Sequence, residues 1–310
     1  MINNIQINLD DVITFLKDIN VFYHCQGDVI SVKKFASLKK VEENSLYFFT
    51  GNELPDKLNK SIVLVNTTFE IVDKKNTFIK VDNPQLIFYK LMNHYYPQKT
   101  GLISKNSLIS QDAVLGSNIA VGDFSKLGSI TIGDNTKIGN NVVIHDGVTI
   151  GHNAIISDNT VIGASGVAWI WDDATENRIM QPQIGGVLIG DNVFIGSNVT
   201  IARGSVNEST NILSGSIISH GTQIGHGVQI HQNVHVANNC ALAGNASIGS
   251  ECFIGAGAIV SSQVNIAPKV TLGAGAIASK NIELEGGIYI GMPARVIPQQ
   301  DRMNGVPQKK

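Results

Sequence analysis

Residues 212–272 read ILSGSIISHGTQIGHGVQIHQNVHVANNCALAGNASIGSECFIGAGAIVSSQVNIAPKVTL, and an aliphatic residue recurs in them at every sixth position. This period predicts the fold of most of the chain. Many of these aliphatics are followed by glycine, as in IGSECFIGAG (248–257). Such a six-residue unit suits a short strand followed by a tight bend, where glycine tolerates backbone angles that other residues resist. Three units close one triangular coil of about 18 residues, so the aliphatics of successive coils stack into a continuous core. The unbroken run consists of Ile212, Ile218, Ile224, Ile230, Val236, Leu242, Ile248, Ile254, Val260, Ile266 and Leu272.

The same period extends upstream, through residues 109–162 with a one-residue slip after Leu127, and again through residues 189–201. It fails between Ile162 and Ile189, where the segment GASGVAWIWDDATENRIMQPQIGG contains both tryptophans. A loop this long in a regular solenoid is expected to project and to reach a neighbouring subunit or a ligand. The alternative is a local hydrophobic flap.

The first hundred residues lack the six-residue period. LDDVITFLKDI (9–19) and NPQLIFYKLMNHYY (83–96) have helical spacing, whereas NSLYFFT (44–50) and SIVLVN (61–66) are typical of strands. We therefore expect an N-terminal α/β domain over 1–100, a solenoid over 101–298 with an inserted loop over 164–186, and a C-terminal tail over 299–310.

Composition narrows the classes of partner and compartment. A formal net charge of −2, with 15% charged residues, provides no broad basic field, so nucleic acid is not expected as a partner. Three cysteines without a regular spacing fit reduced thiols in a cytoplasmic protein better than a disulfide framework. The N-terminus lacks the pattern of a signal peptide, and no segment reaches membrane-spanning length. We expect a cytoplasmic protein without a membrane span.

The hexapeptide pattern resembles that of the left-handed parallel β-helix acyltransferases. This resemblance implies a mainly β fold, a left-handed parallel β-helix that assembles as a homotrimer with active sites between subunits. A more specific resemblance rests on FIKVDNPQLIFYKLM (78–92), on QPQIGGVLIGDNVFIGSNVTIARGSVNEST (181–210) and on QIGH (223–226). In this order the segments are similar to the UDP-3-O-acylglucosamine N-acyltransferases of lipid A synthesis, which have IPQIG, TIDRGA and QIAH runs. The resemblance covers nearly the whole chain and implies a sugar-nucleotide N-acyltransferase.

Matching QIGH to QIAH places the catalytic base on His226. Bacterial sugar N-acetyltransferases give the same residue, because their base is followed nine residues later by a histidine and then by AGN; here these are His235 and AGNASIG (243–249). A histidine suits the reaction because a sugar amine that attacks a thioester must lose a proton near neutral pH. Gly244 follows His226 by one coil, and both families use a glycine amide at the matching position as the oxyanion donor.

The partner that orients His226 is left open. The lipid A family has an aspartate where Ser219 stands, and the acetyltransferases have an acid where Gly227 stands. Glu208, roughly one coil earlier, is a possible partner of the base.

The acyl donor is expected to be acetyl-CoA, a co-substrate, with no permanently bound cofactor or metal. A second histidine of the lipid A family falls on Gln263, and its C-terminal helical extension has no counterpart. The predicted solenoid ends instead in IYIGMPARVIP (288–298), which resembles the G-x-P-A-R ending of acetyl-CoA-dependent hexapeptide enzymes. Candidate donor-binding residues are His235, Ser262, Lys280 and Arg295. Candidate nucleotide-sugar-binding residues are Phe48 (or Phe49 if the register slips), Gln183 in the IPQIG-like run, and His220.

Together these features predict an N-acyltransferase that moves an acetyl group to the amine of a UDP- or dTDP-linked amino sugar, for surface polysaccharide or O-antigen synthesis. One alternative is the lipid A enzyme itself, which uses 3-hydroxyacyl carrier protein. Another is a β-helix zinc carbonic anhydrase, since His226 and His231 have the required spacing, although the upstream region lacks a third histidine. A further alternative is a β-helix that serves only as a subunit scaffold, but that role would not require His226 and Gly244 to lie one coil apart. The sequence leaves three points open: which sugar is the acceptor, which of its carbons bears the amine, and whether the nucleotide carries uracil or thymine.

Overall fold

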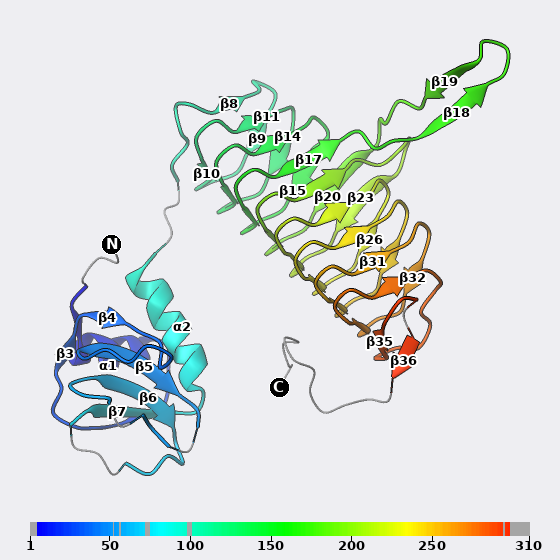
Figure 1. Ribbon diagram of the computed structural model, residues 1–310. Coiled ribbons are helices and arrows are strands. Elements are labelled where there is room, and N and C mark those ends of the chain that lie inside the picture. The colour runs from blue at the N-terminus through cyan, green and yellow to red at the C-terminus, as the bar shows by residue number, and fades with distance from the viewer. Residues whose placement is uncertain are drawn as a thin grey trace. The chain divides into compact units, whose positions relative to one another are not determined.

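The computed structural model describes residues 5–51, 53–55, 57–71, 75–97, 101–293 and 295–297 (Figure 1). The chain divides into two compact units, Met1–Gln98 and Lys99–Lys310. The predicted tail, 299–310, lies outside the described residues.

The N-terminal unit is built on a five-stranded sheet with the strand order β2-β7-β6-β5-β4, in which β4 to β7 run parallel and β2 is antiparallel. Its strands are β2 (His24–Gln26), β4 (Lys34–Phe35), β5 (Ser45–Phe49), β6 (Ile62–Asn66) and β7 (Thr77–Val81), and β1 (Ile7–Asn8) pairs with β3 (Ser31–Val32) outside this sheet. The helices are α1 (Leu9–Asp18) and α2 (Pro84–Tyr95). The side chain of Asn83 caps α2 by accepting from the Leu86 N–H, and Pro84 opens the helix. The helices and strands predicted for this region are confirmed.

The second unit is a triangular prism of parallel strands (Figure 1). The coil predicted from the six-residue period and the left-handed parallel β-helix implied by the resemblance are both confirmed. The nine-stranded face consists of β8 (Leu108–Ile109), β11 (Lys126–Leu127), β14 (Val143–Ile144), β17 (Val161–Ala164), β22 (Thr200–Ala202), β25 (Gln223–Ile224), β28 (Ala241–Leu242), β31 (Ile259–Val260) and β34 (Ile277–Ala278). The eight-stranded face consists of β9 (Val114–Leu115), β12 (Thr131–Ile132), β15 (Val148–Ile150), β20 (Gly186–Ile189), β23 (Ser209–Ile212), β26 (Gln229–Ile230), β29 (Ser247–Ile248) and β32 (Asn265–Ile266). The ten-stranded face consists of β10 (Ala120–Val121), β13 (Lys137–Ile138), β16 (Ile155–Ile156), β21 (Phe194–Ile195), β24 (Ile217–Ile218), β27 (His235–Val236), β30 (Phe253–Ile254), β33 (Thr271–Leu272), β35 (Ile288–Ile290) and the antiparallel β36 (Arg295–Ile297).

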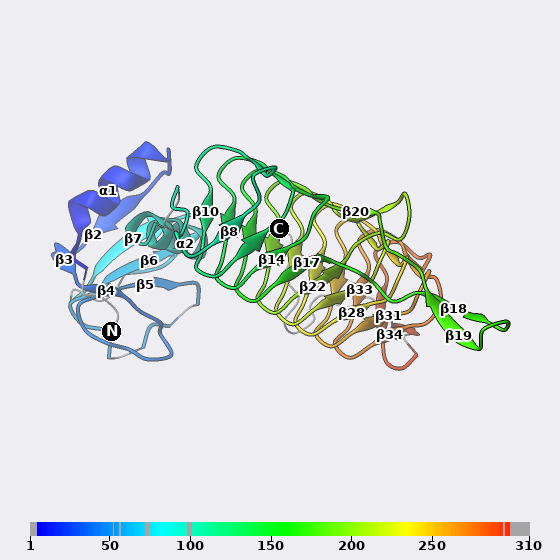
Figure 2. The same cartoon turned by 90° about the horizontal axis from the view of Figure 1, so that it is seen from above.

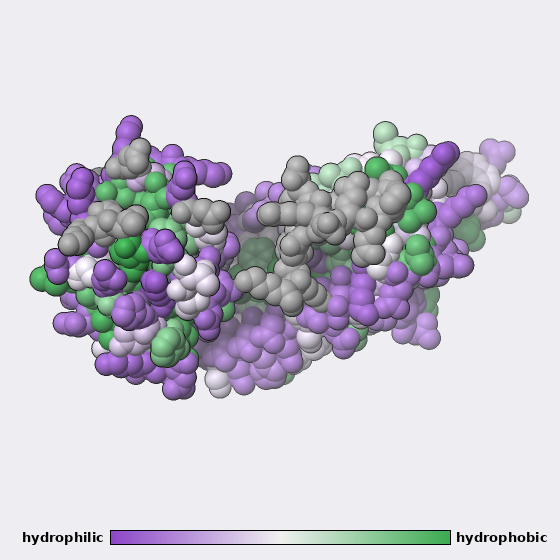
Figure 3. Space-filling model, turned by 90° about the horizontal axis from the view of Figure 1, so that it is seen from below, coloured by the Kyte–Doolittle hydropathy of each residue, from purple (hydrophilic) through white to green (hydrophobic). Residues whose placement is uncertain are grey.

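The parallel strands pair with the strand one coil later, as Ile224 with Leu242 and Leu242 with Val260, and the register shifts at a bulge between β17 and β22. The aliphatics of the repeat point inward and are almost completely buried in one continuous core. Outward strand positions hold both polar and apolar residues, with Leu188, Ile217 and Ile259 among the exposed apolar ones, and Figure 3 shows hydrophilic residues over much of the underside of the prism. The six-residue pattern therefore determines which residues form the core, and the turns at the corners are where reactive side chains can be placed.

The corners of the prism use asparagine in the left-handed backbone region, which asparagine tolerates better than most residues. Ten asparagines from Asn118 to Asn245 have positive φ at these corners, which explains the recurrent IGDN and IGSN runs. In the first coils of the prism, a backbone N–H at a corner often donates to a side chain of the next coil. The Ser129 N–H, for example, donates to the Asp146 carboxylate at 2.7 Å.

The segment that breaks the period forms an antiparallel hairpin, β18 (Trp169–Asp172) with β19 (Asn177–Met180), which projects away from the prism (Figures 1 and 2). Trp169 pairs with Met180, and the Arg178 guanidinium lies 4.7 Å from the centroid of the Trp169 ring. Several of its apolar side chains are exposed, among them Trp169, Ile170 and Met180. The contact of this hairpin with a neighbouring subunit or a ligand stays a prediction.

Among the described residues, no helix has the length and apolar character needed to cross a membrane.

Candidate active site

The chemistry-bearing residues gather at one corner of the prism, where the nine-stranded face turns into the eight-stranded face. His226 occupies this corner between β25 and β26, and we call the column of turns above and below it the His226 corner. The projecting hairpin leaves the prism from this column, between β17 and β20, and the loop Arg203–Glu208 bulges from it between β22 and β23. The two longest departures from the hexapeptide repeat therefore flank the predicted base.

His226 and Gly244 lie directly one above the other, as the sequence predicts. The Asn245 N–H donates to the His226 carbonyl at 2.8 Å, and a methyl group on Gly244 would lie only 2.6 Å from His226 Nε2. No acceptor lies on the Gly244 N–H within the part of the chain that the structure describes. Several coils toward the N-terminus, the Ser129 N–H in the same column is capped by Asp146, whereas the Gly244 N–H has no such cap.

The other nitrogen of the imidazole has a partner that the sequence analysis missed. His226 Nδ1 lies 3.1 Å from the hydroxyl oxygen of Ser205, which is 8% exposed. Ser205 stands in ARGS, where the lipid A family has RGA, and this departure is the signal that could have identified it.

Glu208 does not bind His226 directly. Its carboxylate accepts from the Ser205 N–H at 2.8 Å and from the Val206 N–H at 3.2 Å. Hydrogen bonds from its own N–H, from Val206 and from Ser205 lower the pKa of Glu208 to about 2, so the carboxylate is ionised at neutral pH. The direct pairing considered from the sequence is therefore replaced by a contact through Ser205.

The two ends of the projecting hairpin meet beside the imidazole. A methyl group on Gly166 would lie 3.3 Å from the Gln183 side-chain oxygen and 3.3 Å from His226 Cβ. Gln183 is 6% exposed, and its Oε1 has no hydrogen-bond partner among the described residues. A buried carbonyl without a donor is costly, which makes this oxygen suited to accept from a ligand.

Of the predicted donor-binding residues, Ser262 and Lys280 continue the His226 corner, one and two coils beyond Gly244. The Gln263 N–H donates to the Gly244 carbonyl at 3.1 Å, and both Ser262 and Lys280 are exposed. Arg295 lies instead on β36, at the end of the ten-stranded face.

The remaining histidines occupy other parts of the prism. His235 lies on the ten-stranded face, packed edge-on against Phe253 with ring centroids 5.0 Å apart, and burial lowers its pKa. His220 is at the corner between the ten- and nine-stranded faces, where its Nδ1 accepts from the Ser197 N–H at 2.8 Å. His231 is exposed at the third corner. Within one chain, His235, His220 and Arg295 are therefore not brought to His226.

No group of three or more His, Cys, Asp or Glu side chains placed to hold a metal ion occurs among the described residues. His226 and His231 stand at different corners, so the five-residue spacing does not bring them together.

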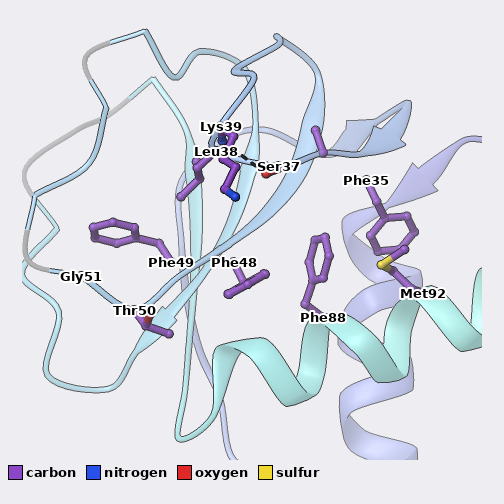
Figure 4. A pocket seen from close by; sticks show the side chains of 11 residues that line it. Phe35, Ser37, Leu38, Lys39, Phe48, Phe49, Thr50, Gly51, Phe88 and Met92 are labelled. Atoms are coloured by element: carbon purple, nitrogen blue, oxygen red, sulfur yellow. Dashed lines mark hydrogen bonds between the residues drawn. The ribbon is translucent and has the colours of Figure 1, made fainter. Parts of the chain in front are cut away.

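The N-terminal unit contains a separate pocket of about 460 Å³ (Figure 4). Phe48 and Phe88 flank it with ring centroids 5.1 Å apart, while Phe49, Thr50 and Lys39 line its other side. Aromatic faces with a nearby cation suit a flat, polar ring that carries phosphate. Both aromatic residues that the sequence offered for base stacking, Phe48 and Phe49, therefore border the same cavity.

Comparisons with known proteins agree with this architecture. Models of the bacterial transferase hexapeptide match residues 129–164 and 227–262, and a model of the hexapeptide repeat of succinyl-transferase matches residues 186–221. No curated protein sequence matches the chain significantly.

Solved structures with a similar fold include UDP-N-acetylglucosamine acyltransferases. That of Bacteroides fragilis is 26% identical, with a TM-score of 0.56 over 63% of this chain and 74% of the other. That of Moraxella catarrhalis is 23% identical, with a TM-score of 0.58 over 63% and 73%. The chain thus carries the hexapeptide repeats of bacterial transferases on the β-helix fold of the hexapeptide-repeat acyltransferases.

Proposed function

We propose that the protein is an N-acyltransferase that moves an acetyl group from acetyl-CoA to the amine of a UDP- or dTDP-linked amino sugar for surface polysaccharide synthesis. The observation that carries this proposal is the stacking of His226 Nε2 on Gly244, whose N–H has no acceptor among the described residues. Acyl transfer needs both a general base and an oxyanion donor, and the two must lie within reach of one carbonyl carbon.

In the proposed reaction the sugar amine attacks the thioester carbonyl carbon, and His226 Nε2 takes the proton that the nitrogen loses as the C–N bond forms. The Gly244 N–H donates to the oxygen that becomes negative. The intermediate then collapses, the C–S bond breaks, and the leaving thiolate takes the proton from the imidazolium to give free CoA. The products are the amide and the thiol, and His226 returns to its neutral form.

The surrounding residues support the same assignment. Gln183 offers an unpaired buried carbonyl oxygen beside His226, which fits an N–H or O–H of the acceptor sugar. We assign Ser262 and Lys280, further along the His226 corner, to the pantetheine arm and phosphates of the donor. The pocket of Phe48 is assigned to the uracil or thymine ring. His235, His220 and Arg295 stay candidates for contacts in a homotrimer, where a neighbouring subunit would bring them to the site.

The test is a thiol-release assay with two sets of substrates. One set pairs acetyl-CoA with UDP- and dTDP-amino sugars, and the other pairs 3-hydroxyacyl carrier protein with UDP-3-O-acylglucosamine or UDP-N-acetylglucosamine. Turnover in the first set supports the proposal and identifies the sugar. Turnover confined to the second set overturns the acetyl donor in favour of the lipid A alternative or of O-acylation.

The assay needs a variant that separates catalysis from folding. His226→Ala is expected to lower kcat by about 10³-fold, within the range of general base catalysis. His152→Ala is the matched control. Like His226, His152 contacts a neighbouring coil through Nδ1, which accepts from the Asp134 N–H at 2.9 Å, but His152 belongs to a coil distant from Gly244. Near-normal turnover by His226→Ala would remove His226 from the mechanism.

A further inference from the structure

The two ring nitrogens of His226 face different groups. Nε2 lies over Gly244, and Nδ1 lies 3.1 Å from Ser205 Oγ. In a neutral imidazole only one nitrogen carries the proton, and the hydrogen bond made by the other nitrogen decides which one. The group at Nδ1 therefore controls whether Nε2 can act as a base.

Two arrangements of protons fit the contact between Ser205 and His226. If the serine hydroxyl donates to Nδ1, the ring proton sits on Nε2 and no lone pair faces Gly244. If Nδ1–H donates to the serine oxygen, Nε2 has its lone pair directed at the site, but the serine proton then needs an acceptor of its own.

Glu208 provides that acceptor. Its carboxylate accepts from the Ser205 N–H at 2.8 Å and from the Val206 N–H at 3.2 Å, so it is held in the same turn as the Ser205 hydroxyl. A carboxylate can only accept, so it offers the serine hydroxyl a charged acceptor within this turn.

The backbone keeps Glu208 close to Ser205. A methyl group on Gly204 would lie 1.9 Å from the Glu208 carbonyl oxygen, and one on Gly185 would lie 2.1 Å from the same atom. The chain can approach this closely only because both residues lack a side chain. The Thr210 hydroxyl donates to the Ala202 carbonyl at 2.7 Å, which ties the two ends of the loop together. The neighbouring cation, Arg203, donates to the Asp146 carbonyl and so is engaged elsewhere.

We propose that Ser205 is a positioning residue that links His226 to Glu208 and holds the imidazole as the Nδ1–H tautomer. The relay runs from His226 Nδ1–H to the Ser205 oxygen, and from the Ser205 hydroxyl to the Glu208 carboxylate. It takes the place of the direct acidic partner that Ser219 and Gly227 do not provide. Its catalytic consequence rests on the proposed function, whereas the tautomer itself does not.

The first experiment reads the tautomer without any substrate. In protein labelled with ¹⁵N in its histidines, two-bond ¹H–¹⁵N correlation spectra distinguish the two neutral tautomers, and the spectrum of His226→Gln identifies the signals of His226 among eight histidines. We expect the Nδ1–H form in the wild type and a mixture or the Nε2–H form in Ser205→Ala. An Nε2–H form in the wild type, or a spectrum unchanged in Ser205→Ala, overturns the relay whatever reaction the protein catalyses.

The second experiment measures kinetics once a substrate pair is known. Ser205→Ala is expected to lower kcat by at least about 10²-fold at unchanged KM, because the wrong tautomer removes the base but not the binding groups. Ser205→Thr keeps the hydroxyl and should restore most of the rate. A loss of less than about threefold in Ser205→Ala overturns the catalytic role of the relay. Near-normal turnover by His226→Ala instead removes His226 from the mechanism, whereas the proposed function itself fails only if acetyl-CoA and the amino sugars give no thiol release.

Ser125→Ala is the matched control for these measurements. The Ser125 hydroxyl is also buried and also joins two coils, since it donates to the Gly139 carbonyl at 2.8 Å and accepts from the Val142 N–H at 3.0 Å. This variant should lower the thermal midpoint without affecting the His226 tautomer or kcat. If Ser125→Ala and Ser205→Ala lose kcat equally, the effect of Ser205 is structural and the positioning role is wrong.

Discussion

Replacing Gly244 by alanine tests the geometry of the site with a single methyl group. In the structure that methyl would lie 2.6 Å from His226 Nε2, whereas ordinary van der Waals contact begins at 3.4 Å, so the ring must move by about 0.8 Å. Such a shift also disturbs the 3.1 Å contact between Nδ1 and Ser205. A misplacement of about 1 Å at a reacting group can cost about 10²-fold in rate, which corresponds to about 2.7 kcal/mol in the activation barrier.

The same substitution should leave the fold intact. Gly244 does not have a positive φ, so alanine fits its backbone, and the imidazole beside it is partly exposed and can rotate away. We therefore expect Gly244→Ala to lower kcat by about 10²-fold while the thermal midpoint changes by no more than about 2 °C. The assay is steady-state thiol release together with a thermal unfolding scan of the same preparation.

Gly257→Ala provides the opposite pattern. Gly257 lies at another corner with a φ of +70°, and a methyl group there would meet no atom within 4 Å. The added side chain is strained by about 1 kcal/mol because of the left-handed backbone, so stability should fall while kcat is unchanged. Wild-type turnover by Gly244→Ala would show that Nε2 and the Gly244 amide do not act on one carbonyl, and the proposed mechanism would be wrong.

Three further measurements address other residues. Phe48→Leu, which keeps an apolar side chain but loses the aromatic face, should raise KM for the nucleotide sugar by about fivefold at unchanged kcat, and an unchanged KM would remove Phe48 from base binding. Because the pKa of Glu208 is about 2 in the folded protein against an ordinary value of 4.5, its stabilising contribution is present above pH 4.5 and is lost as the pH falls toward 2. Urea unfolding should therefore show Glu208→Gln less stable than wild type at pH 7, with a gap that narrows below pH 4.5 and not above it. Burial lowers the pKa of His235 from its ordinary value of 6.5. As the pH falls below 6.5, the histidine is therefore protonated more readily in the unfolded chain than in the folded protein, and the free energy of unfolding decreases. Between pH 7.5 and 5.5, His235→Gln should lose less unfolding free energy than the wild type does.

Much of the architecture was predictable from local sequence patterns. The six-residue spacing of aliphatics such as Ile224 and Leu242 determines which side chains face inward, because a strand followed by a tight bend repeats that geometry in every coil. The same regularity places residues 18 positions apart on one column, so the stacking of Gly244 on His226 followed from counting. In the N-terminal unit, α2 and the strands β5 and β6 matched their apolar patterns and turn residues.

The coil, the corner of His226 and the residue stacked on it were predictable without a structure, since these depend on a fixed period. The contact of Ser205 with the imidazole, and the places of Glu208 and Gln183 around it, depend on tertiary packing, because these three residues lie in segments that break that period. No spacing rule predicts how the Arg203–Glu208 loop folds back, or that Gly185 and Gly204 let it close tightly on itself. The contact of Ser205 with Nδ1, and the absence of one with Glu208, depend on this packing between segments, which no repeat encodes.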